Sequence, residues 1–375
     1  MSIITVISFL IAIAIPGISL YIIFSRDFFS TGSNRFIGWS FFWGTAAFGL
    51  AYLTNSYLLN TAGIDWSTVV RFIAPVEEEI YKGLILIFLV RRKQFTYFVD
   101  GAIYGFAIGI GFAIVENLEY LLSTDQSVQL MVAVVRVIST NLMHATGSSI
   151  IGIAFGLSRS RRRTGQILYP LIGLILSGIL HVIFNVISNS AFNSTIVLII
   201  TITIIGMVGF GMIIFAIRRG LKESRANIEE KLGMKDRVTA GETRAVLSLK
   251  AIDDILEPLA EMFGAEKAIH IEKLLKLQAR MGILRKNLED IQDENLLEST
   301  REDMEETRAQ MEQERQAIGS YAMVYLRGVF PEDDSPLWGN LESMIAESTA
   351  PQAGGLWDQL GSQVKPKPEE TNTEI

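Results

Sequence analysis

The side chains best suited to chemistry in this chain begin with a run of charged residues inside an apolar stretch. Residues 74–83 read APVEEEIYKG and contribute Glu78, Glu79 and Lys82. An ionisable group within a membrane-spanning helix costs about 2.5–3.5 kcal/mol on insertion scales, so such groups usually face the bundle interior and mark function. Further candidates of this kind follow downstream: Glu116 with Asn117, Arg136 with His144, and His181 with Asn185.

Carboxylates and imidazoles gathered around one point predict a site for zinc or another divalent metal, because both are ligands such ions accept. The tentative ligands are Glu116, His144 and His181, although His144 could instead bond a neighbouring helix. A second carboxylate beside the ion could take a proton from water and pass it to a leaving amine. An alternative without metal is a water activated by glutamate, with Asn185 and a histidine holding the oxyanion.

Spacing places these groups at one level and on compatible faces. Counted from the cytoplasmic ends of their helices, Glu78, Glu116, His144 and His181 lie 13 to 16 residues in, or about 20–24 Å at 1.5 Å per residue. Residues four apart share a helix face, which pairs Glu78 with Lys82 and His181 with Asn185. We interpret Lys82 as a charge partner and Glu77 as a bystander. Arg136 is either a catalytic group or the ion-pair partner of a nearby carboxylate.

The elements that must position these groups are long apolar helices. About 20 apolar residues cross a bilayer as a helix, and seven segments qualify: 3–24, 37–59, 68–90, 99–121, 128–157, 166–189 and 193–217. Alternate loops are rich in Lys and Arg, which marks them as cytoplasmic. The sequence therefore predicts an all-α, polytopic membrane helix bundle with its N-terminus outside and its tail in the cytoplasm. Gly101, Gly105 and Gly109 recur every fourth residue, which favours close helix packing on the face that also carries Glu116.

Composition divides the chain near residue 220. Residues 1–220 hold 14 Lys+Arg and 9 Asp+Glu, whereas the remaining residues hold 19 and 31. We therefore predict a membrane domain over 1–220, a cytoplasmic helical or coiled-coil region over 221–330, and a disordered tail over 331–375. The acidic region could dock a cytoplasmic protein or associate with a second copy, and nothing in it predicts nucleic-acid binding. The chain has no cysteine, which excludes disulfides and thiolate metal sites.

Four blocks of sequence, on four consecutive predicted spans, together resemble the PrsW family of intramembrane proteases. The first is APVEEEIYK, which matches an Ala-Pro, Glu-Glu-x-x-Lys pattern with Glu78, Glu79 and Lys82. The second, DGAIYGFAIGIGFAIVENLEY, carries Phe112, Glu116 and Asn117. The third is the His-Ala helix with His144, and the fourth is HVIFN, with His181 and Asn185. The family is related more distantly to the CAAX-prenyl endopeptidases.

The resemblance implies an intramembrane endopeptidase, of metallo- or glutamate type, in a prokaryotic plasma membrane. Its substrates would be membrane proteins such as anti-sigma factors. The catalytic residues that it implies are Glu78, Glu79, Glu116 and His181, supported by Lys82, Asn185 and Arg136. Two other functions remain open from the residues alone. Intramembrane carboxylates and histidines also serve proton-coupled transporters, and a non-catalytic sensor could signal through the tail.

Overall fold

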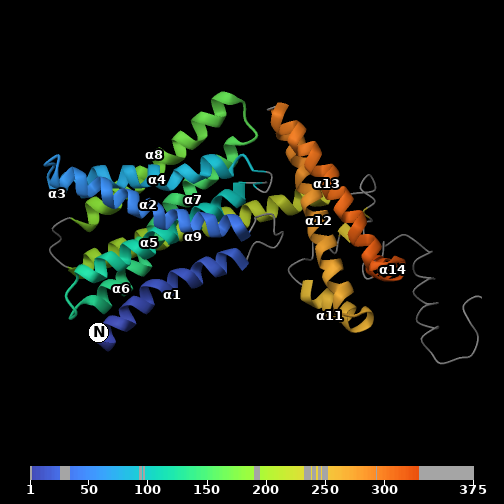
Figure 1. Ribbon diagram of the computed structural model, residues 1–375, viewed down its shortest axis with the longest axis horizontal. Helices are drawn as coiled ribbons and strands as arrows, with labels where there is room; N and C mark the ends of the chain where they lie inside the picture. The colour runs from blue at the N-terminus through green and yellow to red at the C-terminus, as the bar shows by residue number, and fades with distance from the viewer. Residues whose placement is uncertain are drawn as a thin grey trace, which may run out of the picture.

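The computed structural model describes residues 2–25, 34–92, 95, 98–189, 195–231, 238, 242–243, 246, 252–292 and 294–328. Within these residues every regular element is a helix, so the predicted all-α class is confirmed (Figure 1). The predicted disordered tail lies outside the described residues. The helices of the first part are α1 (Ile3–Ser25), α2 (Asn34–Asn60), α3 (Trp66–Thr68), the π-helix η1 (Val69–Ile73), α4 (Ala74–Leu89), α5 (Phe98–Ser123), α6 (Gln129–Ile138), α7 (Thr140–Ser158), α8 (Arg163–Ser188) and α9 (Thr195–Lys231).

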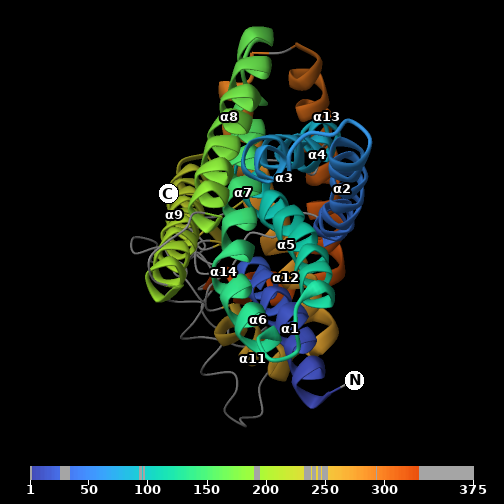
Figure 2. The ribbon, with the colours of Figure 1, turned by 90° about the vertical axis from the view of Figure 1, so that its left-hand side faces the viewer.

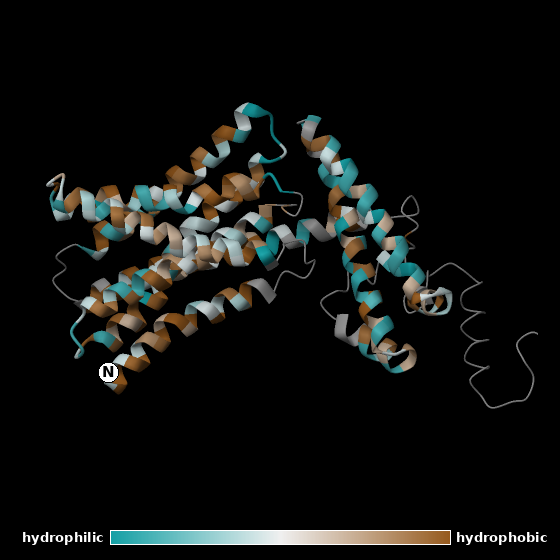
Figure 3. Cartoon of the chain, in the orientation of Figure 1, coloured by the Kyte–Doolittle hydropathy of each residue, from teal (hydrophilic) through white to brown (hydrophobic). Residues whose placement is uncertain are grey.

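The described residues contain six helical segments that are long and apolar enough to cross a membrane. They are Ile3–Ile23, Arg35–Asn60, Phe98–Ser123, Gln129–Ser158, Arg163–Ser188 and Ile199–Gly220. The protein is therefore an integral, multi-pass membrane protein, and its brown, apolar helices stand out in Figure 3. The predicted span 68–90 is also helical, through η1 and α4, but its charged residues set it apart from the six. The count of seven spans and the outward N-terminus remain predictions.

Helix α5 forms the centre of the bundle. In its most apolar stretch 89% of the residues are buried, compared with 22% in the corresponding stretches of α1 and α9. Figure 2 shows α5 between α2 and α7. Glycine permits the close approach to α7, because an added Cβ at Gly105 would lie 2.1 Å from the Ser148 carbonyl oxygen. Gly101 and Gly109 meet α7 in the same way, as the spacing predicted.

The span predicted over 128–157 is present as Gln129–Ser158, but not as one unbroken helix. The helix is interrupted at Ser139, which separates α6 from α7. The hydroxyl of Ser139 donates to the carbonyl oxygen of Val135 at 2.6 Å, a local bond of the kind that competes with regular helix geometry. Because of the break, Arg136 and His144 lie on two separate helices, α6 and α7.

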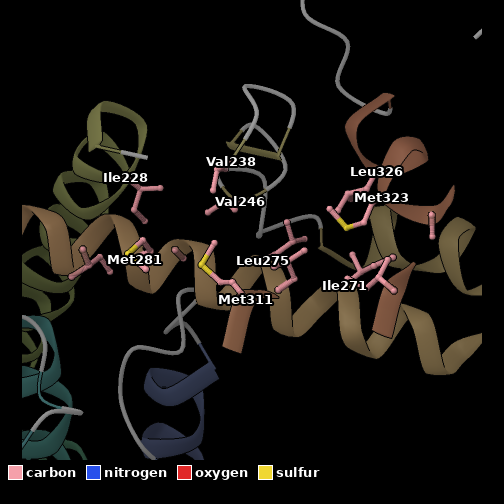
Figure 4. Packing of buried hydrophobic residues seen from close by; sticks show 14 of the residues in the cluster. Ile228, Val238, Val246, Ile271, Leu275, Met281, Met311, Met323 and Leu326 are labelled. Carbon is pink, nitrogen blue, oxygen red and sulfur yellow. The ribbon is translucent and has the colours of Figure 1, made fainter. Parts of the chain in front are cut away.

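The second part of the chain lies at one end of the bundle (Figure 1). Helix α9 runs through Gly220 without interruption and ends at Lys231. The helices that follow it are α11 (Ile252–Phe263), α12 (Ala265–Asp290), α13 (Glu294–Ile318) and α14 (Ser320–Gly328). Helices α12 and α13 form a hairpin, and a core of aliphatic and methionine side chains joins them to α9 and α14 (Figure 4). This core contains Leu275, Met311 and Ile228, each fully buried.

Candidate active site

Four helices bring their ionisable groups together at one buried level. Helix α4 supplies Glu78, Glu79 and Lys82, and α5, α7 and α8 supply one group each: Glu116, His144 and His181. All except Glu116, whose side chain is 16% exposed, are buried. The layer expected from residue counting is thus present as a set of direct contacts, described below.

Glu79 is the carboxylate that holds the site together. Its Oε1 accepts hydrogen bonds from Lys82 Nζ at 2.8 Å and from His181 Nδ1 at 2.9 Å. Its Oε2 accepts a bond of 2.6 Å from the hydroxyl of Ser177. Both oxygens are therefore occupied by donors of the protein. Because a carboxylate bonded in this way is fixed in position, Glu79 is suited to orienting His181.

Glu78, the adjacent residue, has the opposite environment. Its Oε2 is buried and accepts no hydrogen bond. The nearest charged or imidazole nitrogens are Lys82 Nζ and His181 Nε2, each at 3.8 Å. Since His181 donates its Nδ1 proton to Glu79, its Nε2 carries the lone pair, and this lone pair lies near the unpartnered oxygen of Glu78. At 3.8 Å these two atoms are too far apart for a direct hydrogen bond.

His144 links the two sides of the site. Its Nδ1 accepts a hydrogen bond from Lys82 Nζ at 2.8 Å, and its Nε2 donates to Glu116 Oε2 at 2.9 Å. The imidazole lies edge-on to that of His181, with ring centroids 4.8 Å apart, and it also contacts Phe112. The two histidines therefore carry their protons on different ring nitrogens.

Glu116 is held by α6 as well as by His144. Arg136 Nη2 lies 2.8 Å from Glu116 Oε2, and Arg136 Nε donates to the side chain of Asn117 at 2.7 Å. The guanidinium also lies over the ring of Tyr120, 3.8 Å from its centroid. Of the two interpretations of Arg136, the ion pair is thus seen directly, and its partner is Glu116.

The donor set fits a divalent metal. Among the described residues, Glu78, His144 and His181 each offer one ligand atom, and these atoms lie within 4.8 Å of one another. The unpartnered oxygen of Glu78 and the free Nε2 of His181 are the kinds of atom that zinc binds. The bond from His181 to Glu79 is the carboxylate–histidine support common around metals. The sequence had placed Glu116 in the ligand set, whereas the structure gathers Glu78 there and bonds Glu116 to His144.

The predicted residue Asn185 lies apart from this centre, and so does Glu77, the expected bystander. The Asn185 side chain donates to the carbonyl oxygen of Val70 in η1 at 2.9 Å, so it fastens α8 to the π-helix before α4. Glu77 is half-buried and outside the cluster. Sequence reasoning missed Ser177, although it lies four residues before His181 and thus on the same helical face.

Known proteins match the part of the chain that contains this candidate site. Residues 32–217 match the model of the family described as PrsW family intramembrane metalloprotease. The chain is 30% identical over 139 residues to the protein named Protease PrsW of Clostridioides difficile (strain 630). That match covers 36% of this chain and 57% of the relative, so the chain spans less than two thirds of the relative's length. No solved structure matches the chain significantly.

Proposed function

Since this chain belongs, through residues 32–217, to the PrsW family of intramembrane metalloproteases, we propose that it hydrolyses peptide bonds of membrane-embedded proteins. The observation that carries the proposal is the contrast between the two adjacent glutamates of α4. Glu79 accepts three hydrogen bonds, whereas Glu78 keeps a buried oxygen without a donor beside His181 Nε2. A free carboxylate beside a fixed imidazole is what water activation requires.

In the proposed reaction Glu78 is the general base. Its free oxygen takes a proton from a water molecule as the water attacks the peptide carbonyl, and the protonated Glu78 then gives this proton to the leaving amine. Lys82 Nζ lies 3.8 Å from the same carboxylate and brings a positive charge to the site. Glu79 keeps His181 oriented throughout, because it accepts the Nδ1 proton.

Glu78, His144 and His181 are the residues that would hold a metal, and a Glu78 oxygen bound to the ion would not also take the proton from water. A zinc or similar divalent ion, when bound, supplies a positive charge that acidifies a nearby water and polarises the peptide carbonyl. Because His144 Nε2 donates to Glu116, ligation through that nitrogen requires this hydrogen bond to be given up. Glu116 and Arg136 would then stabilise the rearranged layer from α5 and α6. The identity of the ion as zinc is part of the proposal.

The substrates and setting complete the proposal. We infer that the protein lies in a prokaryotic plasma membrane with the C-terminal helices in the cytoplasm, as the basic loops predict. Membrane proteins such as anti-sigma factors are the proposed substrates, and the C-terminal helices are available to a cytoplasmic partner or a second copy. The interpretations as a transporter or a non-catalytic sensor predict no cleavage at all.

Cleavage of a reporter membrane protein by the purified full chain in lipid vesicles tests the proposal. Wild type is compared with Glu78→Gln, Glu116→Gln and His181→Ala, with Glu77→Gln as the matched control. We expect cleavage by wild type and Glu77→Gln and its loss in the other three. Equal activity in all variants would reject the proposed site. Activity that survives a chelator in a metal-free preparation would reject the metal and leave the glutamate mechanism.

A further inference from the structure

Helices α4 and α8 are fastened together near the candidate active site. Glu79 on α4 bonds to Ser177 and His181 on α8. Beyond them, Asn185 bonds to Val70, and the Arg71 guanidinium donates to the carbonyl oxygen of Asn189 at 2.5 Å. Toward the other end the two helices diverge, with α8 rising away from α4 in Figure 1.

A cleft of about 760 Å³ lies between the diverging parts of α4 and α8. Its walls are mainly aliphatic, and several lining residues are exposed toward the space outside the bundle, including Ile80, Leu84 and Leu171. Ile80 directly follows Glu79 in α4, so the cleft begins within one turn of the site. An exposed apolar cleft at membrane depth suits an apolar segment of another membrane protein. At the wide end the lining becomes polar, with Arg91, Arg159 and Gln166.

The first turns of α13 reach this wide end. Leu296 and Ser299 are among the residues that line the cleft. Just before α13, the backbone N–H of Gln292 donates to the carbonyl oxygen of Ser160, in the turn between α7 and α8, at 3.2 Å. Helix α13 is thus docked on the membrane helices.

The negative charge of Asp303, on α13, also acts on a residue of the membrane part, Arg159. Burial lowers the pKa of Arg159 to about 10, and the negative charges of Asp100 and Asp303 act in the opposite direction. Arg159 itself donates to the carbonyl oxygens of Val90 and Arg92, just after α4. The α13 carboxylate therefore acts on the side chain that anchors the end of α4.

We propose that the cleft between α4 and α8 is the path by which an apolar substrate segment reaches Glu78, and that the start of α13 closes its wide end. The start of α13 is therefore a gate, by which the C-terminal region controls access to the active site. Movement of α13 off the membrane helices opens the path, and a partner that binds the C-terminal helices sets how often this happens. This inference rests on the proposed function, which supplies the kind of substrate.

Photo-crosslinking to a synthetic apolar transmembrane peptide measures access without requiring cleavage. A photoreactive residue is placed at Leu171, which lines the cleft, or at Ile172, its neighbour outside the lining; their exposures are similar, 49% and 45%. Both are made in the full-length Glu78→Gln chain, in phosphatidylcholine vesicles. The wide end is then opened with Leu296→Lys, because the new positive charge would lie at the same end of the cleft as Arg91 and Arg159 and be repelled by them. Leu297→Lys is the matched control outside the lining.

We expect the peptide to crosslink at residue 171 in preference to 172, and Leu296→Lys, but not Leu297→Lys, to raise that preference several-fold. A second variant closes the gate instead. Since the chain lacks cysteine, Ile167→Cys with Leu296→Cys can be joined by a bismaleimide, which should lower the preference. Equal yields at residues 171 and 172, no response to either gate variant, or crosslinking to phospholipid alone would overturn the proposal.

The outcomes separate the two proposals. If access responds to Leu296→Lys while neither wild type nor that variant with Glu78 intact cleaves the reporter, the gate is supported and the protease function is rejected. If wild type cleaves its reporter and access ignores α13, the function stands and the gate is rejected.

Discussion

Charged side chains have different roles in the two parts of this molecule. At the candidate site of the membrane part they are few and mostly buried: Lys82, for example, is fully buried against Glu79 and His144. In the α12–α13 hairpin they are numerous and lie mainly on the surface. There Lys276 pairs with Glu272 one turn away at 2.6 Å, and both side chains are more than a third exposed.

This difference between buried and exposed charges shows what stabilises each part and where the chemistry of the molecule lies. A buried charge that loses its partner is left in a medium that solvates it poorly, whereas an exposed charge is solvated by water. The polar contacts of the membrane part therefore determine both its structure and its proposed reaction. The C-terminal helices depend on the apolar core of Figure 4, which contains Leu275 and Met311.

The largest expected effect is that of Glu78→Gln on catalysis. Loss of the general base should lower the cleavage rate by about 10²–10⁴-fold, because no other carboxylate in the described part of the site has an unpartnered oxygen beside His181 Nε2. Glu77→Gln, one position earlier, should leave the rate nearly unchanged. Initial rates on a reporter substrate check both. A similar loss in both variants would remove the distinction between the glutamates.

Lys82→Met should have the next largest effect, on stability. Removing one partner of a buried ion pair costs about 3–5 kcal/mol, and here it leaves Glu79 without its charged donor. The double variant Lys82→Met with Glu79→Gln should recover part of this loss, because it leaves no uncompensated charge. Thermal unfolding in detergent, followed by intrinsic fluorescence, measures both. A single variant as stable as wild type would show that water reaches this layer.

Much of the candidate site could be predicted from the sequence, because polar groups in a membrane helix have few other places to go. Glu78, Glu116, His144 and His181 were expected at one level and do lie together, and the glycines of α5 do face α7. The general fold class followed from the same apolar segments.

Other features depend on tertiary contacts that no local pattern reveals. The break at Ser139 coincides with a hydrogen bond from its hydroxyl to the preceding helical turn. The role of Ser177 depends on how near α4 comes to α8. Spacing alone placed Asn185 beside His181, yet its amide bonds to η1. The docking of α13 near Ser160 joins segments far apart in the chain.

Leu275→Ala tests the apolar side of the comparison. Truncation of a fully buried leucine costs about 2–5 kcal/mol, and the loss should be confined to the C-terminal helices because Leu275 packs in the core that joins them to the last turns of α9. Hydrogen–deuterium exchange should show faster exchange in α12 and α13 and unchanged exchange in α5. The matched control is Ile269→Ala on the same helix, where the side chain is exposed. Faster exchange in α5 as well would mean that the two parts unfold together.

The smallest effect is expected for Lys276→Ala, the surface counterpart of Lys82→Met. The Lys276–Glu272 pair joins residues four apart on an exposed helix face, and such pairs contribute about 0.3–0.5 kcal/mol. Removal of a lysine charge, which disrupts the membrane layer at position 82, should here leave exchange in α12 almost unchanged, and the small loss should vanish in high salt as the charges are screened. A loss comparable to that of Leu275→Ala, insensitive to salt, would mean that the hairpin surface is covered in the folded protein. The contrast between buried and exposed charges would then not divide the molecule at the end of α9.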